Sequence, residues 1–152
     1  MNVRIPLQGF AQRAKIRYAT MDHSTQPPVI LIVDDAPEML VLLNHLMRHL
    51  APTYDIITLS DAQSALSHLA QRTVPLLITD YMLPGMNGLQ LTAAVKAASP
   101  MTHVILATGY SSAELEQRAR EQHVDTFLPK ADLFDRLEDV VRNVLQLASA
   151  QE

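Results

Sequence analysis

Five short apolar stretches alternate with segments of helical periodicity along this chain, and that alternation limits its possible folds most strongly. The clearest stretch is VILIV at residues 29–33, which lies between a proline and two aspartates. Apolar runs of this length, bounded by turn residues, are typical of strands buried on both faces. Further strands are predicted at residues 54–59, 76–79, 103–107 and 125–128.

A helix is predicted after each strand, because apolar residues then recur every three or four positions. Asp35 is expected to cap the first helix, with Pro37 in its first turn, while Asp61 caps the second and Ser111 or Ser112 the fourth. The third helix is predicted at 88–98. The last runs from 133 to about 148, with an apolar face of Leu137, Val140, Val141, Val144 and Leu145.

Strict alternation with short connections predicts an α/β fold, in which a βα unit is repeated five times. The expected architecture is a doubly wound, five-stranded parallel sheet with helices on both faces, of the flavodoxin-like kind. In such folds the functional site lies beyond the carboxyl ends of the strands. The residues that end each strand are therefore the first candidates for chemistry.

Those strand ends carry charged and polar side chains. Asp34 and Asp35 follow the first strand, and Asp80 follows the third, in the stretch LLITDYMLPGMNG at residues 76–88. Thr108 ends the fourth strand, and Lys130 comes shortly after the fifth. One edge of the sheet is thus predicted to collect three carboxylates, one hydroxyl and one ammonium group.

This set of groups suits the transfer of a phosphoryl group. Three neighbouring carboxylates repel one another, so that at least one has a raised pKa unless a cation neutralises them. A few oxygen ligands with open coordination positions suit Mg²⁺. A carboxylate can attack phosphorus to form an aspartyl phosphate, and Lys130 and Thr108 could stabilise the charge on its oxygens.

At this point the sequence resembles the receiver domain of two-component response regulators, of the chemotaxis-type single-domain kind. The resemblance is carried, in order, by VDD (33–35), TDYMLPGMNG (79–88), ATG (107–109) and TFLPK (126–130). It implies a receiver domain over residues 28–150. Residues 1–27 are then an N-terminal extension. We expect it to be disordered, or the true start to be Met21, in preference to a basic surface-binding segment.

The resemblance also implies a role for each site residue. Asp80 would be the phospho-acceptor and Lys130 the lysine that contacts the phosphoryl group. Mg²⁺ would be held by Asp34, Asp35 and Asp80, Asp35 binding directly, with the backbone carbonyl of Met82 as a further ligand. Thr108 would be the switch hydroxyl and Phe127 the switch aromatic residue, although an aromatic residue in a strand is more often core.

The partners implied by the resemblance are proteins. A histidine kinase or a phosphotransfer protein would supply the phosphoryl group, and the module would assist only its own phosphorylation and dephosphorylation. Its output would be a downstream protein or a second copy of itself, bound through the fourth helix, the fifth strand and the last helix. No direct contact with nucleic acid or membrane is expected.

Composition agrees with these exclusions. Residues 1–21 hold four basic and no acidic residues, so the rest of the chain carries 8 basic and 16 acidic ones, a balance of −8 that disfavours nucleic-acid binding. No apolar run approaches the roughly 20 residues that a membrane span needs. The absence of cysteine excludes disulfides and thiolate sites and agrees with a cytoplasmic location.

Two departures from the family pattern surround the site. Ala131 follows Lys130, where the family commonly has a proline joined by a cis peptide bond, which leaves the geometry of this loop open. Two residues after Asp80 and Thr108 stand Met82 and Tyr110, positions that influence dephosphorylation in the family. Because both side chains are bulky, we hypothesise slow loss of the phosphoryl group.

Other functions fit the residues less well. A phosphatase of the haloacid-dehalogenase type needs Asp-x-Asp after the first strand, and this chain has Asp-Asp-Ala. A flavodoxin-like cofactor binder needs a phosphate loop rich in Ser, Thr and Gly there. A phosphorylation-independent, receiver-like binding module remains the alternative.

His45 and His49 have the spacing of metal ligands but lack the acid of the HExxH motif, which favours a solvated helix face.

Overall fold

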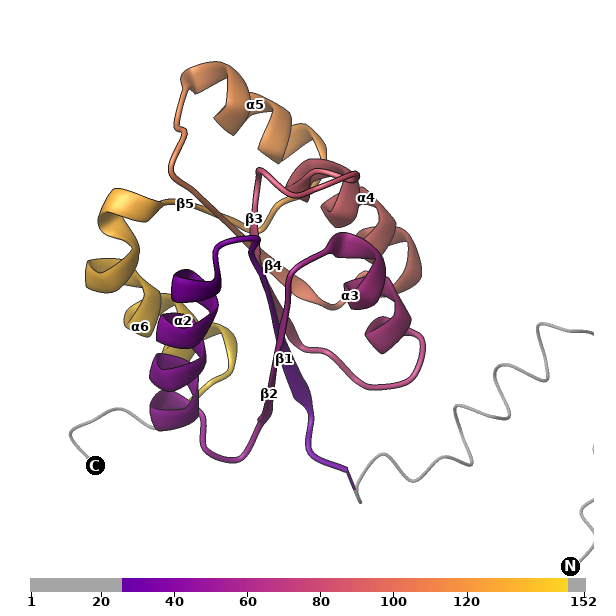
Figure 1. The fold of residues 1–152 in the computed structure, drawn as a ribbon, viewed down its shortest axis with the longest axis vertical. Coiled ribbons are helices and arrows are strands. Elements are labelled where there is room, and N and C mark those ends of the chain that lie inside the picture. Colours follow the sequence, from indigo (N-terminus) through magenta and orange to yellow (C-terminus); the bar gives the residue numbers. More distant parts are fainter. Residues whose placement is uncertain (1–25, 148–152) are drawn as a thin grey trace, which may run out of the picture.

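A computed structural model describes residues 26–147 of the chain. The strands are β1 (Val29–Val33), β2 (Asp55–Leu59), β3 (Leu76–Asp80), β4 (His103–Thr108) and β5 (Thr126–Pro129). The helices are α2 (Pro37–Leu50), α3 (Ala62–Leu69), α4 (Gly88–Ala98), α5 (Ala113–Glu121) and α6 (Leu133–Val144), with a 3-10 helix at Lys130–Asp132. Strands and helices alternate throughout (Figure 1).

The five strands form one parallel sheet in the order β2-β1-β3-β4-β5. The chain therefore winds outward from β1 in one direction to β2, and then from β3 in the other direction to β5. This confirms the predicted fold class, the flavodoxin-like doubly wound sheet. The change of winding direction between β1 and β3 is the topological switch point, where sites in this fold class are built.

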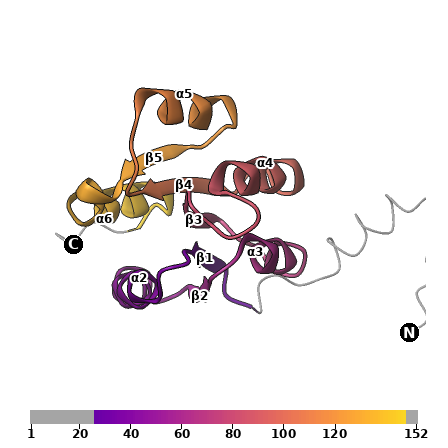
Figure 2. The same cartoon turned by 45° about the horizontal axis from the view of Figure 1, so that its top comes forward.

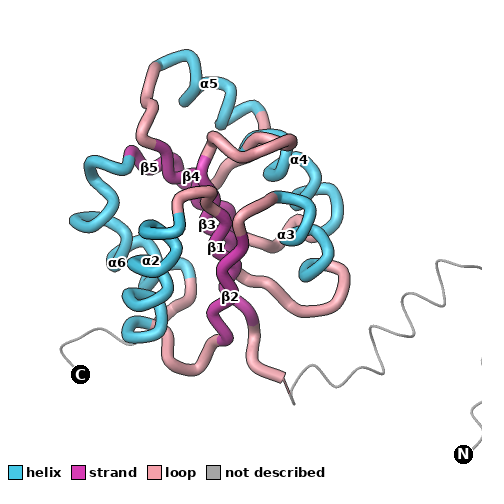
Figure 3. Tube along the Cα trace, in the orientation of Figure 1, coloured by secondary structure: helices cyan, strands magenta, loops and turns pink. Residues whose placement is uncertain are grey.

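Helices cover both faces of the sheet, as Figures 1 and 3 show for α2 and α6 on one side and for α3 and α4 on the other. Alternate residues of the fully buried β1 point to opposite faces. Ile30 and Ile32 lie in the core beneath α2 and α6, whereas Leu31 lies in the core beneath α3 and α4. A smaller cluster joins α4, α5 and β4 around Leu106, and the tilted view of Figure 2 shows α5 beside β5.

Side chains cap three of the five helices. Asp61 accepts a hydrogen bond from Ser64 N–H, Ser112 accepts one from Leu115 N–H, and Asn87 forms a capping box with Gln90. The prediction that Asp35 caps the first helix is wrong. The cap position falls one residue later, on Ala36, whose side chain has no acceptor atom. The carboxylate of Asp34 accepts the Ala36 N–H at 2.9 Å.

The element boundaries differ from prediction by a residue or two at several ends. β4 continues to Thr108, and β5 lies one residue later than expected and ends at Pro129. A proline is tolerated there because, within residues 26–147, β5 is an edge strand that pairs with β4 alone. The last helix ends at Val144, short of the predicted 148.

Within residues 26–147 no helix is long and apolar enough to span a membrane.

The predicted extension at residues 1–27 lies almost wholly outside the described residues, as does the end of the predicted receiver domain at 150. Both boundaries stay predictions. At the start of the described range, Pro27 contributes a carbonyl oxygen that accepts a hydrogen bond from Arg72 at 2.7 Å.

Gly88 allows the first turn of α4 to lie directly against the end of β3. A Cβ atom at this position would overlap the carbonyl oxygen of Asp80 and press on the side chain of Leu106. The Gly88 N–H donates to the Tyr81 carbonyl at 2.8 Å and holds the two segments together. The glycine thus fixes the position of the backbone from which Asp80 projects.

We expect Gly88→Ala to lower the free energy of unfolding by about 1–3 kcal/mol, the usual cost of an overpacked core position. Gly109→Ala is the matched control, because a Cβ atom there meets only the Lys130 side chain, at 3.9 Å. The control is expected to change stability by less than about 1 kcal/mol. Urea denaturation measures both, and equal stabilities for the two variants would contradict this account of Gly88.

Candidate functional site

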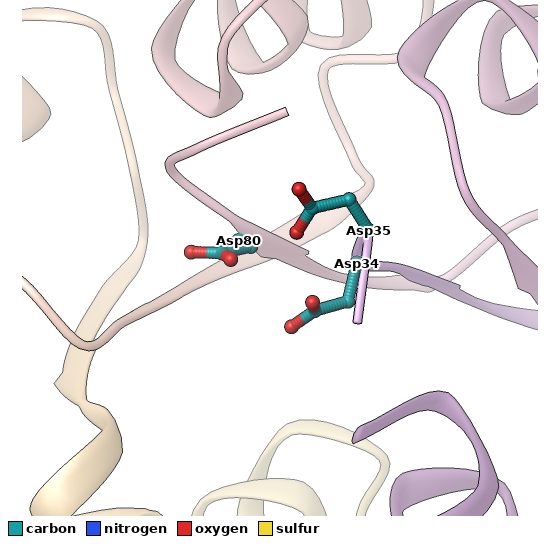
Figure 4. Close-up of side chains that lie close together, drawn as sticks. All are labelled: Asp34, Asp35 and Asp80. Carbon is teal, nitrogen blue, oxygen red and sulfur yellow. The ribbon is translucent and has the colours of Figure 1, made fainter. Parts of the chain in front are cut away.

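Three carboxylates meet at the carboxyl edge of the sheet, where the sequence predicts them. Asp34 and Asp35 directly follow β1, and Asp80 is the last residue of the neighbouring β3, whose Thr79 pairs with Val33. One oxygen atom of each carboxylate lies within 4.8 Å of the others. Figure 4 shows the three side chains, which extend from the two strand ends around one region.

The three acids differ in their exposure to solvent. Asp34 and Asp80 are 2% and 7% exposed, whereas Asp35 is exposed to solvent. Asp35 has no hydrogen bond or ion pair within the described part of the chain, so its carboxylate is available to a ligand. The cluster thus combines two buried, fixed carboxylates with one accessible carboxylate.

Lys130 joins the two buried carboxylates. Its ammonium nitrogen lies 2.9 Å from Asp34 Oδ2 and 3.1 Å from Asp80 Oδ2. It belongs to the 3-10 helix that follows the edge strand β5, 50 residues beyond Asp80 in the sequence. Three carboxylates and one ammonium group leave the site negatively charged.

The environment shifts the protonation of these groups. Burial raises the pKa of Asp80, and the charge of Asp34 raises it further, while the hydrogen bond and the charge of Lys130 oppose the rise without cancelling it. For Lys130, burial works against the charged form, but the hydrogen bonds and charges of Asp34 and Asp80 outweigh it and raise its pKa. The ammonium group therefore stays charged.

Backbone contacts hold the end of β3 in place. Met82 N–H donates to Asp80 Oδ1 at 3.4 Å, and the Thr79 hydroxyl donates to the Asp80 carbonyl at 3.0 Å. The Met82 side chain is 62% exposed. The role of the Met82 carbonyl as a metal ligand stays a prediction.

Thr108 lies at the same edge of the sheet but bonds to its own loop. It is buried at the end of β4, one residue beyond Ala107, which pairs with Asp80. Its hydroxyl donates to the Tyr110 carbonyl at 3.0 Å and accepts the Tyr110 N–H at 3.1 Å. The structure thus brings Thr108 to the edge that holds the acids, with its hydroxyl engaged by the main chain of Tyr110.

Phe127 is a packing residue in this structure. It pairs with Leu106 in the β4–β5 register and lies, partly buried, against the cluster that includes Leu89 and Leu115. This agrees with the core interpretation of a strand aromatic residue, and a switching role stays a prediction.

Lys130 contacts both Asp34 and Asp80 although Ala131, and not a proline, follows it. Lys130 and Ala131 form part of a regular 3-10 turn, and residues 26–147 contain no cis peptide bond. Sequence reasoning missed two supports of the site: the Ala36 N–H on Asp34 and the close approach of Gly88 to Asp80. Gly88, the second glycine of PGMNG, is a visible signal for the second support, whereas no residue type could signal a backbone N–H.

The donor set fits a hard divalent cation. All three clustered side chains offer carboxylate oxygen, the ligand type that suits Mg²⁺ and Ca²⁺, and so few protein ligands leave positions for water, as Mg²⁺ prefers. Lys130 compensates Asp34 and Asp80 but forms no ion pair with Asp35 in the described structure. An acidic triad of this kind is typical of the metal site of receiver domains.

Comparison with known families decides the class of the chain. The family model described as "Response regulator receiver domain" matches residues 30–142. The chain belongs to this family. The receiver domain with its acidic pocket, Asp34, Asp35 and Asp80, is a module of two-component signalling and not an enzyme. A receiver works with a kinase or a phosphotransfer partner.

Individual relatives agree. The transcriptional regulatory protein GlrR of Escherichia coli is 31% identical over 123 residues, which cover 81% of this chain but only 27% of that protein. The sporulation initiation phosphotransferase F of Bacillus subtilis is 28% identical, and the match covers 79% of this chain and 95% of that protein. The crystal structure of the signal receiver domain of an HD domain-containing protein from Pseudomonas fluorescens matches with a TM-score of 0.68 and 33% identity, covering 80% of this chain and 96% of that one.

The raised pKa of Asp80 leads to a prediction about stability. Asp80→Asn is expected to stabilise the fold at neutral pH, on the order of 1 kcal/mol, because it removes a buried charge beside Asp34. As the pH falls through the raised folded pKa of Asp80, the wild-type carboxylate takes up a proton and wild-type stability rises, so the advantage of the variant shrinks.

Urea denaturation of both proteins from neutral to mildly acidic pH measures this difference. Asp135→Asn, at an exposed position of α6, is the matched control and is expected to change little. A stability advantage of Asp80→Asn that is absent at neutral pH, or that grows on acidification, would contradict the assignment of Asp80 as the carboxylate with the raised pKa.

Proposed function

We propose that this receiver accepts a phosphoryl group onto Asp80 from the phosphohistidine of a histidine kinase or phosphotransfer protein, and signals through altered protein contacts. The observation that carries the proposal is the ammonium group of Lys130, held between the buried carboxylates of Asp34 and Asp80 at the carboxyl edge of the sheet. A structural ion pair would need one carboxylate, whereas this arrangement keeps one more acid than a single lysine neutralises.

The proposed transfer is a displacement at phosphorus. A carboxylate oxygen of Asp80 forms the new P–O bond, the P–N bond to the donor imidazole breaks, and its electron pair stays on the departing nitrogen. Negative charge is spread over the three other phosphoryl oxygens during this step. Lys130 already lies 3.1 Å from Asp80 Oδ2, close enough to stabilise that charge without a large movement.

The proposed metal is Mg²⁺, held by Asp34, Asp35, Asp80 and the Met82 carbonyl, with Asp35 as a direct ligand. Bound there, it would supply neutralisation of the charge on the phosphoryl oxygens. The support for this assignment is the oxygen-only donor set and the accessible Asp35 carboxylate. Asp34 and Asp80 are oriented for this role by Lys130 and by the Ala36 and Met82 N–H groups.

The proposed response begins at Thr108 and Phe127. A phosphoryl group on Asp80 offers new oxygen acceptors beside β4, and the Thr108 hydroxyl can reach them only by leaving the main chain of Tyr110. Phe127 lies on the edge strand next to α5 and is only partly buried, so it can move together with the segment of Thr108 and Tyr110.

The proposed partner surface is formed by α5, β5 and α6, where Phe134 is 52% exposed. The cytoplasmic location stays a prediction.

Incubation with Mg²⁺ and a small acyl-phosphate donor tests the proposal by intact mass. The wild type is expected to gain the mass of one phosphoryl group, and Asp80→Asn to gain none. Lys130→Ala is expected to be phosphorylated much more slowly, because the charge on the phosphoryl oxygens lacks a partner. A chelator should abolish the gain.

The exposed Asp135→Asn variant serves as the control and should match the wild type. A folded wild type that gains no mass from the acyl phosphate or from a phosphohistidine protein would overturn the proposal. It would favour the alternative function, a receiver-like module that binds a protein without phosphorylation.

The lifetime of the phosphorylated form is a separate prediction. Met82 and Tyr110 follow Asp80 and Thr108 by two residues, and their side chains are 62% and 67% exposed at this edge. If both hinder the approach of water in line with the P–O bond, phospho-Asp80 should outlive a free acyl phosphate. Met82→Ala combined with Tyr110→Ala should shorten the lifetime several-fold.

Loss of the added mass after removal of the donor gives the rate. Met101→Ala is the matched control, because Met101 is 91% exposed and lies in the loop before β4, at the amino ends of the strands and away from the acids. A double variant that keeps the wild-type lifetime would remove the steric explanation while leaving phosphorylation itself untouched.

A further inference from the structure

Two histidines share the outer face of α2. His45 and His49 lie four residues apart in this 14-residue helix, and both are exposed. Four residues advance about 6 Å along a helix and return to nearly the same face, so the two imidazoles project side by side. Among the chain's six histidines, only His45 and His49 combine this spacing with a shared helix in the described structure.

Neither imidazole is used by the fold. Within residues 26–147 no hydrogen bond or ion pair involves His45 or His49, whereas the ring of His103 is hydrogen-bonded to Thr126 at 2.9 Å. The charged neighbour Arg48 is held by Asn44, whose side-chain oxygen accepts its Nε–H at 2.9 Å. The four ring nitrogens of the pair are therefore free for a ligand.

The position of the pair in the helix also favours a cation. α2 begins next to the acidic pocket and ends at Leu50, so His49 lies in its last turn. The carbonyl groups at a helix carboxyl end give it a partial negative charge that attracts cations. Over a helix of 14 residues, about 20 Å long, this end is well separated from the three carboxylates.

We propose that His45 and His49 bind one divalent transition-metal ion, of the class Cu²⁺, Ni²⁺ or Zn²⁺, with water completing the coordination shell. Neutral imidazole nitrogen suits these ions, whereas Mg²⁺ selects oxygen donors. The receiver then carries two metal sites of different chemistry at opposite ends of α2. This site does not depend on phosphorylation of Asp80.

Two ligands on one rigid helix bind more tightly than one, because the second imidazole is already in place when the first binds. Removal of either histidine is therefore expected to weaken the site about tenfold or more. Removal of an isolated histidine should have no such effect. His68 on α3 provides that control, since no other histidine lies one turn from it.

The test uses the full chain with excess Mg²⁺, which is added to fill the proposed site at the acidic pocket. Calorimetric titration with Ni²⁺ should show one ion bound, with affinity weakened about tenfold or more in His45→Gln and in His49→Gln but kept in His68→Gln. With Cu²⁺, the electron paramagnetic resonance spectrum should show coupling to two nitrogen nuclei in the wild type and to one in either single variant. Circular dichroism confirms that each variant is folded.

Two results would overturn the site. One is Ni²⁺ affinity that is the same in the wild type, His45→Gln and His49→Gln. The other is a Cu²⁺ spectrum from an oxygen-only environment, which would place the ion at the carboxylates. Neither result bears on phosphorylation, which is read from the mass gain on Asp80.

Discussion

The bridge formed by Lys130 between Asp34 and Asp80 is the interaction on which the site depends. Without a positive charge, two buried carboxylates side by side would repel each other and favour protonation. With it, both acids are held at the sheet edge within hydrogen-bond distance of one ammonium group. The parallel sheet makes this possible, because it aligns the carboxyl ends of β1, β3 and β5 at one edge.

The rest of the fold can be understood as support for that arrangement. β1 and β3 are buried along their whole length, so the acids that end them project from fixed backbone. Gly88 lets α4 lie against the Asp80 carbonyl, and the helices on both faces keep water away from the strands. Burial and the charge of Asp34 raise the pKa of Asp80, so the hydrogen bond and the charge of Lys130 compensate this carboxylate only in part.

Much of this was predictable from the sequence, because strong periodicity and the polar residues that end apolar runs are local signals. These signals were sufficient to predict five strands, a doubly wound sheet, and the placement of Asp34, Asp35, Asp80 and Lys130 at one edge of that sheet. The failures involve local detail that residue type does not determine. Asp35 has the right residue type to cap α2, but the helix begins one residue later and the cap position falls on Ala36, which has no side-chain acceptor. Likewise, residue type could not reveal that the Thr108 hydroxyl bonds to the main chain of Tyr110.

The placement of Lys130 has a consequence for local motion. The lysine that compensates the buried acids follows β5, a strand of four residues with a single neighbour at the rim of the sheet. Edge segments of this kind open more readily than central strands. When β5 separates from β4, Lys130 moves away with it, and the two buried carboxylates at the ends of β1 and β3 lose their positive partner. Opening of the edge strand β5 therefore coincides with stronger repulsion between the carboxylates of Asp34 and Asp80, and a change in either one alters the other.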